Sequence, residues 1–169
     1  MINSRRSLTA TVGVLVGLAL VAAGLWAQAA SPLSGTWTLN LAKSKYNPPT
    51  NAPKSNMVVY QVTGNDIKAT AETVDAQGRK VHVDYTAKMD GKDYPYHRTI
   101  DGAADATQDA ISWKKIDDNT YESTGKAKGQ PLTTTRIVVS KDGKSRTNTA
   151  TGKGPQGEAV NNVIVFDRK

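Results

Sequence analysis

The chain has 169 residues and no cysteine, which excludes disulfide bonds, thiolate metal ligands and thiol catalysis. Its formal net charge is +7, from 22 basic and 15 acidic residues. The basic residues are scattered, without the runs of roughly five or more like charges that mark nucleic-acid-binding arms. We therefore expect one domain of ordinary size with a solvated surface and no nucleic-acid partner.

The first segment has the pattern of an export signal. Arg5 and Arg6 precede the apolar run Leu8–Trp26, and Ala27-Gln28-Ala29 is the small-x-small pattern that signal peptidase accepts. We predict that residues 1–30 are a signal peptide and that residues 31–169 form one domain, exported to the periplasm or the extracellular space. Because the run exceeds the usual length of about 7–15 residues, an uncleaved anchor is the alternative, and Arg5-Arg6 leaves a twin-arginine route open.

After the leader, apolar and polar residues alternate, and turn residues recur about every 8–12 positions, as in a meandering antiparallel β domain. No segment has a convincing helical period. The predicted strands are Gly35–Leu41, Ser55–Thr63, Ile67–Val74, Lys80–Met89, Asp93–Arg98, Ala110–Ile116, Thr120–Lys128, Leu132–Ser140, Ser145–Gly152 and Val160–Asp167. Asp142-Gly143 is the strongest hairpin turn, whereas the proline-rich stretch Ala42–Lys54 predicts a crossing loop.

About ten strands linked by hairpins predict an all-β, up-and-down antiparallel barrel, because closure removes the two unpaired edges of a flat sheet. Within Ser145–Gly152, three threonines alternate with Arg146, Asn148 and Ala150, so neither face is strongly apolar. Burying such strands in a dry core leaves polar groups unpaired, which favours a wet interior. The alternative is a filled core around Val58, Val83, Ile111 and Val165.

A family resemblance is carried by Gly35-x-Trp37 on the first strand after an export signal. It resembles the opening motif of the lipocalin and fatty-acid-binding (calycin) barrels. That resemblance implies that Trp37 plugs one end of the barrel and packs against a basic residue of the last strand, for which Arg168 is the candidate. It thus assigns Gly35, Trp37 and Arg168 to barrel closure.

The mature chain also resembles a group of short exported bacterial proteins described only as lipocalin-like. The shared stretches read "GTWTLNLAKSKYNP", "MDGKDYP", "VSKDGKS" and "NNVIVFD". This resemblance implies a fold and no particular function. Ala42–Lys54 departs from the fatty-acid-binding barrels, being too short and too rich in proline for their helical lid.

Catalytic and metal-binding patterns are missing from the sequence. His82 and His97 are the two histidines, and they lack the flanking ligand pattern of a metal site. No nucleophile elbow, phosphate-binding loop or dinucleotide fingerprint occurs, and the acidic turn residues do not follow the spacing of a calcium loop. We expect no enzymatic activity, no cofactor and no metal.

The stretch most typical of a ligand site is "YPYHR", Tyr94–Arg98, in which strand alternation places Tyr94, Tyr96 and Arg98 on one face. Aromatic surface beside a guanidinium suits an amphiphilic carboxylate. Periodicity does not reveal which face points inward. The predicted ligand-binding residues are Tyr85, Tyr96, Arg98, Trp113, Tyr121 and Arg136.

We predict a monomeric barrel that binds a small apolar or amphiphilic molecule and is not stably inserted in a membrane after signal cleavage. The alternative is a cell-envelope interaction protein whose filled barrel is only a scaffold.

Overall fold

The computed structural model describes residues 30–154 and 157–169. The predicted signal segment, apart from Ala30, lies outside the described residues. No helix among those described has the length and apolarity to cross a membrane. The strands are β1 (Gly35–Leu39), β2 (Ser55–Thr63), β3 (Asp66–Val74), β4 (Lys80–Lys88), β5 (Asp90–Pro95), β6 (His97–Ile100), β7 (Ala103–Ala104), β8 (Ala110–Lys115), β9 (Thr120–Ala127), β10 (Gln130–Val139), β11 (Ser145–Lys153) and β12 (Ala159–Arg168).

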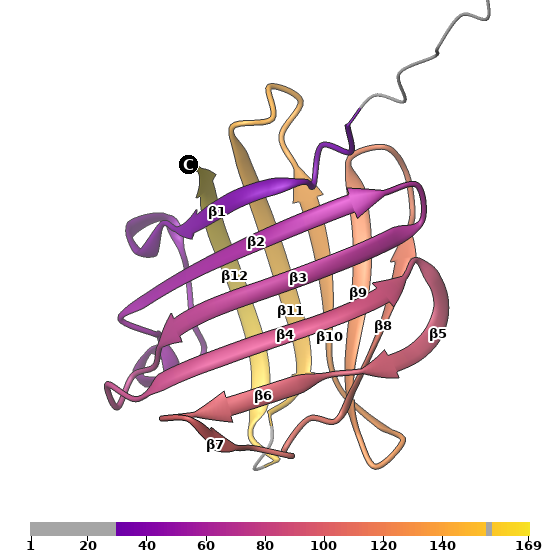
Figure 1. The fold of residues 1–169 in the computed structure, drawn as a ribbon. Helices are drawn as coiled ribbons and strands as arrows, with labels where there is room; N and C mark the ends of the chain where they lie inside the picture. The colour runs from indigo at the N-terminus through magenta and orange to yellow at the C-terminus, as the bar shows by residue number, and fades with distance from the viewer. Residues whose placement is uncertain (1–29, 155–156) are drawn as a thin grey trace, which may run out of the picture.

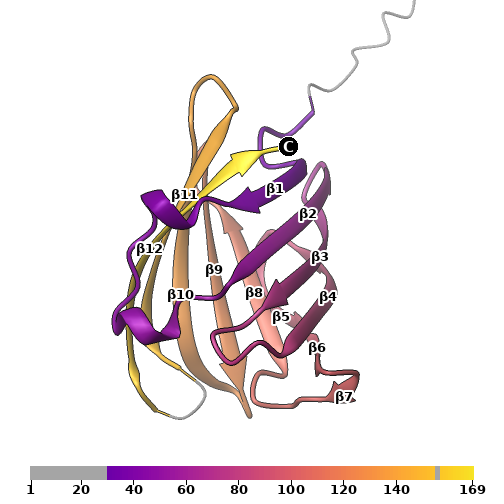
Figure 2. The ribbon, with the colours of Figure 1, turned by 90° about the vertical axis from the view of Figure 1, so that its left-hand side faces the viewer.

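The fold class predicted from the sequence is confirmed: the strands form one antiparallel, all-β sheet wound into a flattened barrel. In Figure 1, β1–β4 and β6 form a front layer, and β8–β12 cross behind it at a steep angle. Figure 2 shows the same two layers from the side. Neighbours in the chain pair as hairpins from β2 to β4 and from β8 to β12, while β1 joins the ends by pairing with both β2 and β12.

The sheet returns on itself through one continuous segment. β6 pairs with β4, β5 pairs with β8, and only Tyr96 separates β5 from β6. The sequence predicted one strand there and about ten in total. The described residues contain twelve, because the segment changes partner at Tyr96 and β7 adds a pair of residues.

The turns follow the expected chemistry. Between β10 and β11, Gly143 has φ +68°, a conformation that costs glycine little. The Asp142 carboxylate accepts hydrogen bonds from Ser140 Oγ at 2.6 Å and from the Lys144 amide at 3.0 Å. The predicted Asp142-Gly143 hairpin is therefore present, fixed by a glycine and an aspartate that each supply what the turn requires.

The connection between β1 and β2 is a long loop, as its prolines predict, and contains two short 3-10 helices, Leu41–Lys43 and Pro49–Asn51. The predicted crossing is wrong, because β1 and β2 are paired antiparallel neighbours in the sheet. The loop is held against the last strand, because Lys45 forms a backbone bridge with Val163 and Asn40 Nδ2 donates to Asp167 at 2.6 Å. No α-helical lid occurs among the described residues.

The core lies between the two layers of the barrel. Its largest fully buried side chains include Trp37, Trp113, Arg146 and Tyr121. The side chains around Trp37, among them Leu33 and Phe166, form the filled end of the barrel. Other core residues, such as Trp113 and Ile137, also line a cavity.

Candidate functional site

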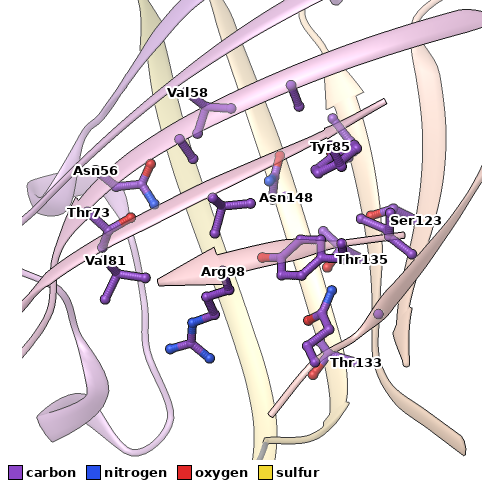
Figure 3. A pocket seen from close by; sticks show the side chains of 18 of the residues that line it. Asn56, Val58, Thr73, Val81, Tyr85, Arg98, Ser123, Thr133, Thr135 and Asn148 are labelled. Carbon is purple, nitrogen blue, oxygen red and sulfur yellow. The ribbon is translucent and has the colours of Figure 1, made fainter. Parts of the chain in front are cut away.

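The interior of the barrel contains a cavity of about 470 Å³. That volume lies within the range of roughly 300–1,000 Å³ found for small-molecule sites. Figure 3 shows Asn56, Thr73 and Val81 on one side and Tyr85, Ser123 and Thr135 on the other. The lining side chains are Asn51, Pro53, Asn56, Val58, Tyr60, Ala69, Ala71, Thr73, Asp75, Val81, Val83, Tyr85, Tyr96, Arg98, Gln108, Ile111, Trp113, Ser123, Thr133, Thr135, Ile137 and Asn148, together with Gly125.

One wall of the cavity is aromatic. The rings of Tyr85 and Tyr96 are stacked with centroids 5.7 Å apart, and Tyr85 lies 6.3 Å from the Trp113 ring. Tyr60 meets Trp113 edge-on at 5.8 Å. Burial raises the pKa of Tyr96 to about 12 and raises that of Tyr85 well above its ordinary value, so both phenols are neutral at physiological pH. The wall offers flat apolar surface with hydroxyl groups at its edges.

Beneath this wall lies Arg146, which is 1% exposed. Its Cζ sits 4.0 Å from the ring centroid of Phe166, 5.1 Å from that of Tyr60 and 5.5 Å from that of Trp37. Its Nη1 donates to Asn148 Oδ1 at 3.0 Å, and Asn148 lines the cavity. The guanidinium is therefore one hydrogen bond away from the cavity surface.

Arg146 lacks an ionic partner among the described residues. Its Nε and Nη2 have no hydrogen-bond acceptor, although the Tyr60 phenol lies nearby. Burial lowers the pKa of the guanidinium, and Tyr60 and Tyr85 offset part of that shift. An unpaired buried cation is costly in a low-dielectric interior, so an anion reaching this point would be strongly favoured.

Within the described part of the chain, the buried side-chain atoms without a hydrogen-bond partner all belong to this interior. They are Nε and Nη2 of Arg146, Nε1 of Trp113 and Oδ1 of Asn56. Trp113 and Asn56 line the cavity directly. Three donors and one acceptor of the interior thus lack a partner at hydrogen-bonding geometry, although the Tyr60 phenol lies near Arg146 and the Tyr85 phenol lies near Trp113.

The mouth of the cavity is bordered by ion pairs. Arg98 Nη1 lies 3.3 Å from Asp105 Oδ2 and donates to Thr107 Oγ1 at 2.9 Å. Arg79 Nε lies 2.7 Å from Asp75 Oδ2. Burial alone would raise the pKa of Asp105, but hydrogen bonds from Thr107 and the charge of Arg98 lower it below its ordinary value. The charge of Arg98 is thereby largely satisfied, unlike that of Arg146.

The structure brings Tyr85, Tyr96, Arg98 and Trp113 together around one cavity, and their role in ligand binding stays a prediction. Tyr121 points inward but lies at the filled end, where its hydroxyl donates to the Asp118 carbonyl at 3.1 Å. It does not line the cavity.

Arg136 requires a correction. It is exposed on the outer face of β10, opposite Glu122 of β9 and Thr149 of β11. Successive side chains of a strand point to opposite faces of the sheet. Because Ile137 and Val139 of the same strand are buried in the core, Arg136 points outward. The inward guanidinium that sequence analysis assigned to β10 is instead supplied by Arg146 of β11.

The three residues assigned to barrel closure meet at the filled end. The Arg168 guanidinium lies over the Trp37 ring at 4.2 Å and donates to the carbonyls of Pro32, Ser34 and Gly143. Trp37 Nε1 donates to the Leu33 carbonyl at 2.9 Å. Gly35 has φ +129°, and a Cβ there would overlap Arg168 Nη1, so this glycine makes room for the guanidinium.

Sequence reasoning missed Arg146, Tyr60 and Asn148 as site residues. The sequence held one signal for two of them. Arg146 and Asn148 alternate with threonines, so they share one face of a strand whose two faces are otherwise similar in polarity. Their inward direction is set by pairing with Phe166 and Ile164 of β12. That pairing is not visible in β11 itself.

No protein-family model matches the chain. No curated protein matches it in sequence either. Among solved structures, the fold is similar to that of zebrafish ileal bile acid-binding protein in complex with cholic acid, at 14% sequence identity and a TM-score of 0.48, over 82% of this chain and 100% of that chain.

Proposed function

We propose that this protein binds a small amphiphilic molecule in the barrel, with the anionic or strongly hydrogen-bond-accepting end of the molecule directed toward Arg146. The observation that carries the proposal is a fully buried guanidinium with two unused nitrogens directly below the cavity. Charge-assisted hydrogen bonds are the strongest that such a donor pair forms. The aromatic wall of Tyr85, Tyr96 and Trp113 would hold the apolar part of the ligand.

The filled-barrel scaffold is not favoured, because the barrel holds a cavity of about 470 Å³, which is large enough for a small molecule. Binding of a small molecule is therefore the function that the geometry supports best.

The test uses matched pairs of acids and alcohols. Dodecanoate is compared with dodecanol, and naphthalene-2-carboxylate with naphthalene-2-methanol, by thermal unfolding and isothermal titration calorimetry. A bound acid at 100 times its dissociation constant adds about 2.7 kcal/mol of stability, which raises the melting temperature by roughly 10 °C. The corresponding alcohol should bind at least about 100-fold more weakly. If no acid in the panel shifts the transition, the proposal is wrong.

Export is a separate proposal, supported by the leader sequence alone. Intact-mass measurement of the protein recovered from the extracytoplasmic fraction should show an amino terminus at Ala30 or Ser31. Recovery of only the uncleaved chain from the membrane fraction would favour the anchor.

A further inference from the structure

The outer face of the front layer carries a group of side chains that plays no part in the cavity. Both histidines of the chain, His82 and His97, lie on this face, which is turned toward the viewer in Figure 1. His82 and Asp84 belong to β4, two residues apart, and His97 of β6 is directly opposite Asp84. Glu72 of β3 is directly opposite His82. The sheet thus brings four ligand-type side chains from three strands onto one face.

The position of these residues follows from the partner change at Tyr96. The pairing of β4 with β6 runs from Val81 to Asp84, and beyond this point the segment departs toward β8. The point where the segment leaves β4 is a fork in the sheet. A surface hollow of about 520 Å³ lies at this fork, lined by His82, Asp84 and His97 among others. Exposed side chains at such a fork have room to turn toward one another.

The contacts of His82 match those of a metal-binding histidine. Its Nδ1 lies 2.5 Å from Glu72 Oε1, and because a carboxylate only accepts hydrogen bonds, Nδ1 carries the proton. In the neutral ring this leaves the Nε2 lone pair free. Metal-ligating histidines usually donate their other N–H to a carboxylate in this way, which fixes the ring and raises its basicity.

The free Nε2 of His82 faces a second ligand. It lies 4.0 Å from Asp84 Oδ1. Two donors on one tetrahedral Zn²⁺, each about 2.0–2.1 Å from the metal, lie about 3.3 Å apart. A displacement below 1 Å therefore brings this pair to coordinating distance, and the directly opposed position of His97 places its ring within reach of the same point.

We propose that His82, Asp84 and His97 bind one divalent transition-metal ion, with Zn²⁺ as the representative ion and Glu72 orienting His82. As the side chains stand, no three ligand groups among the described residues converge on one point. Binding therefore requires rotation of the exposed side chains, above all of His97. Two imidazoles and one carboxylate suit zinc or copper better than calcium or magnesium, which prefer oxygen ligands alone.

The local charge is compatible with this assignment. Glu72 and Asp84 supply two negative charges, and Lys68 is the one basic residue among those that line the hollow. The site has three protein ligands, so a fourth coordination position stays open to water or to an external ligand. Its ligands lie on the opposite face of the sheet from the cavity, and Tyr85 is the one residue that lines both the hollow and the cavity.

The experiment titrates Zn²⁺ into the untagged protein as cells produce it, followed by calorimetry and by NMR of the imidazole groups. Because the chain has two histidines, the spectrum contains two imidazole spin systems and each ring is read separately. We expect one ion per chain and a simultaneous shift of both rings. His82→Ala, His97→Ala and Asp84→Asn should each weaken binding at least about tenfold, and Glu72→Gln by about 10- to 100-fold.

Asp66→Asn is the matched control, since Asp66 lies on the same face of β3 but pairs with Lys88 outside the hollow. It should bind Zn²⁺ as the wild type does. An unchanged far-ultraviolet circular dichroism spectrum checks that each variant is folded. The proposal is overturned if only one imidazole shifts, if any of the three ligand variants binds like the wild type, or if about 1 mM Zn²⁺ produces no saturable binding.

Discussion

Replacing Arg146 with methionine separates ligand binding from stability. Methionine retains a similar length and apolar contact with Phe166 and Trp37 but removes the charge. If Nε and Nη2 each form a charge-assisted hydrogen bond with a bound carboxylate, each contributes about 1.5–3 kcal/mol. Their loss amounts to about 3–6 kcal/mol, which weakens binding of the acid between roughly 100- and 20,000-fold.

The effect of Arg146→Met on the ligand-free protein is the small difference of two larger quantities. The variant relieves two buried, unpaired donors, at about 1–3 kcal/mol each. It loses the hydrogen bond to Asn148 and the attraction of the guanidinium to three aromatic rings, which together are also worth a few kcal/mol. We therefore expect the free energy of unfolding to stay within about 2 kcal/mol of the wild-type value.

The assay combines urea unfolding with calorimetric titration of whichever acid binds the wild type. Arg136→Met is the matched control, since it removes the same charge from the outer face of the barrel. It should change neither stability nor affinity. A folded Arg146→Met variant that binds the acid within about threefold of the wild type would refute the reasoning and make Arg146 a structural residue.

Three further predictions concern closure and pH. Gly35→Ala should destabilise the protein by at least about 2 kcal/mol in urea unfolding, because it combines a positive φ with overlap on Arg168. The control Gly129→Ala, at φ +76° with open space around the added Cβ, should destabilise the protein by only about 1 kcal/mol. Equal losses of stability would argue against the closure contact. The pKa of Asp105 is lower in the folded protein than in the unfolded chain. Its carboxylate therefore stabilises the fold above the ordinary carboxylate pKa, and this stabilisation disappears as the pH falls through the pKa of the folded protein. Wild type should therefore exceed Asp105→Asn in stability by up to about 1 kcal/mol at pH 6 and lose that advantage as the pH falls below the ordinary carboxylate pKa of about 3.9. A pH-independent difference would contradict this. Because burial raises the pKa of Tyr96 to about 12, wild-type stability should decline between about pH 10 and pH 12 more steeply than that of Tyr96→Phe, as followed by chemical unfolding; identical slopes would show that Tyr96 is not held neutral.

The sequence by itself determined the local structure of this protein. Alternation fixed most strands to within a residue or two, as in β2, and turn chemistry located hairpins such as Asp142-Gly143, because both depend on side chains close together in the chain. The break at Tyr96 escaped prediction, since it reflects a change of pairing partner between β4 and β8.

Only the tertiary structure decided which face of each strand points inward. Alternation has a period of two and is unchanged by exchanging the faces, so Arg136 and Arg146 were equally eligible until the pairing of β11 with β12 placed Arg146 beside Phe166. The same dependence on register brought His82 and His97 to one fork of the sheet. Both the environment of Arg146 and the shared face of His82 and His97 depend on how strands pair, which no single stretch of sequence encodes.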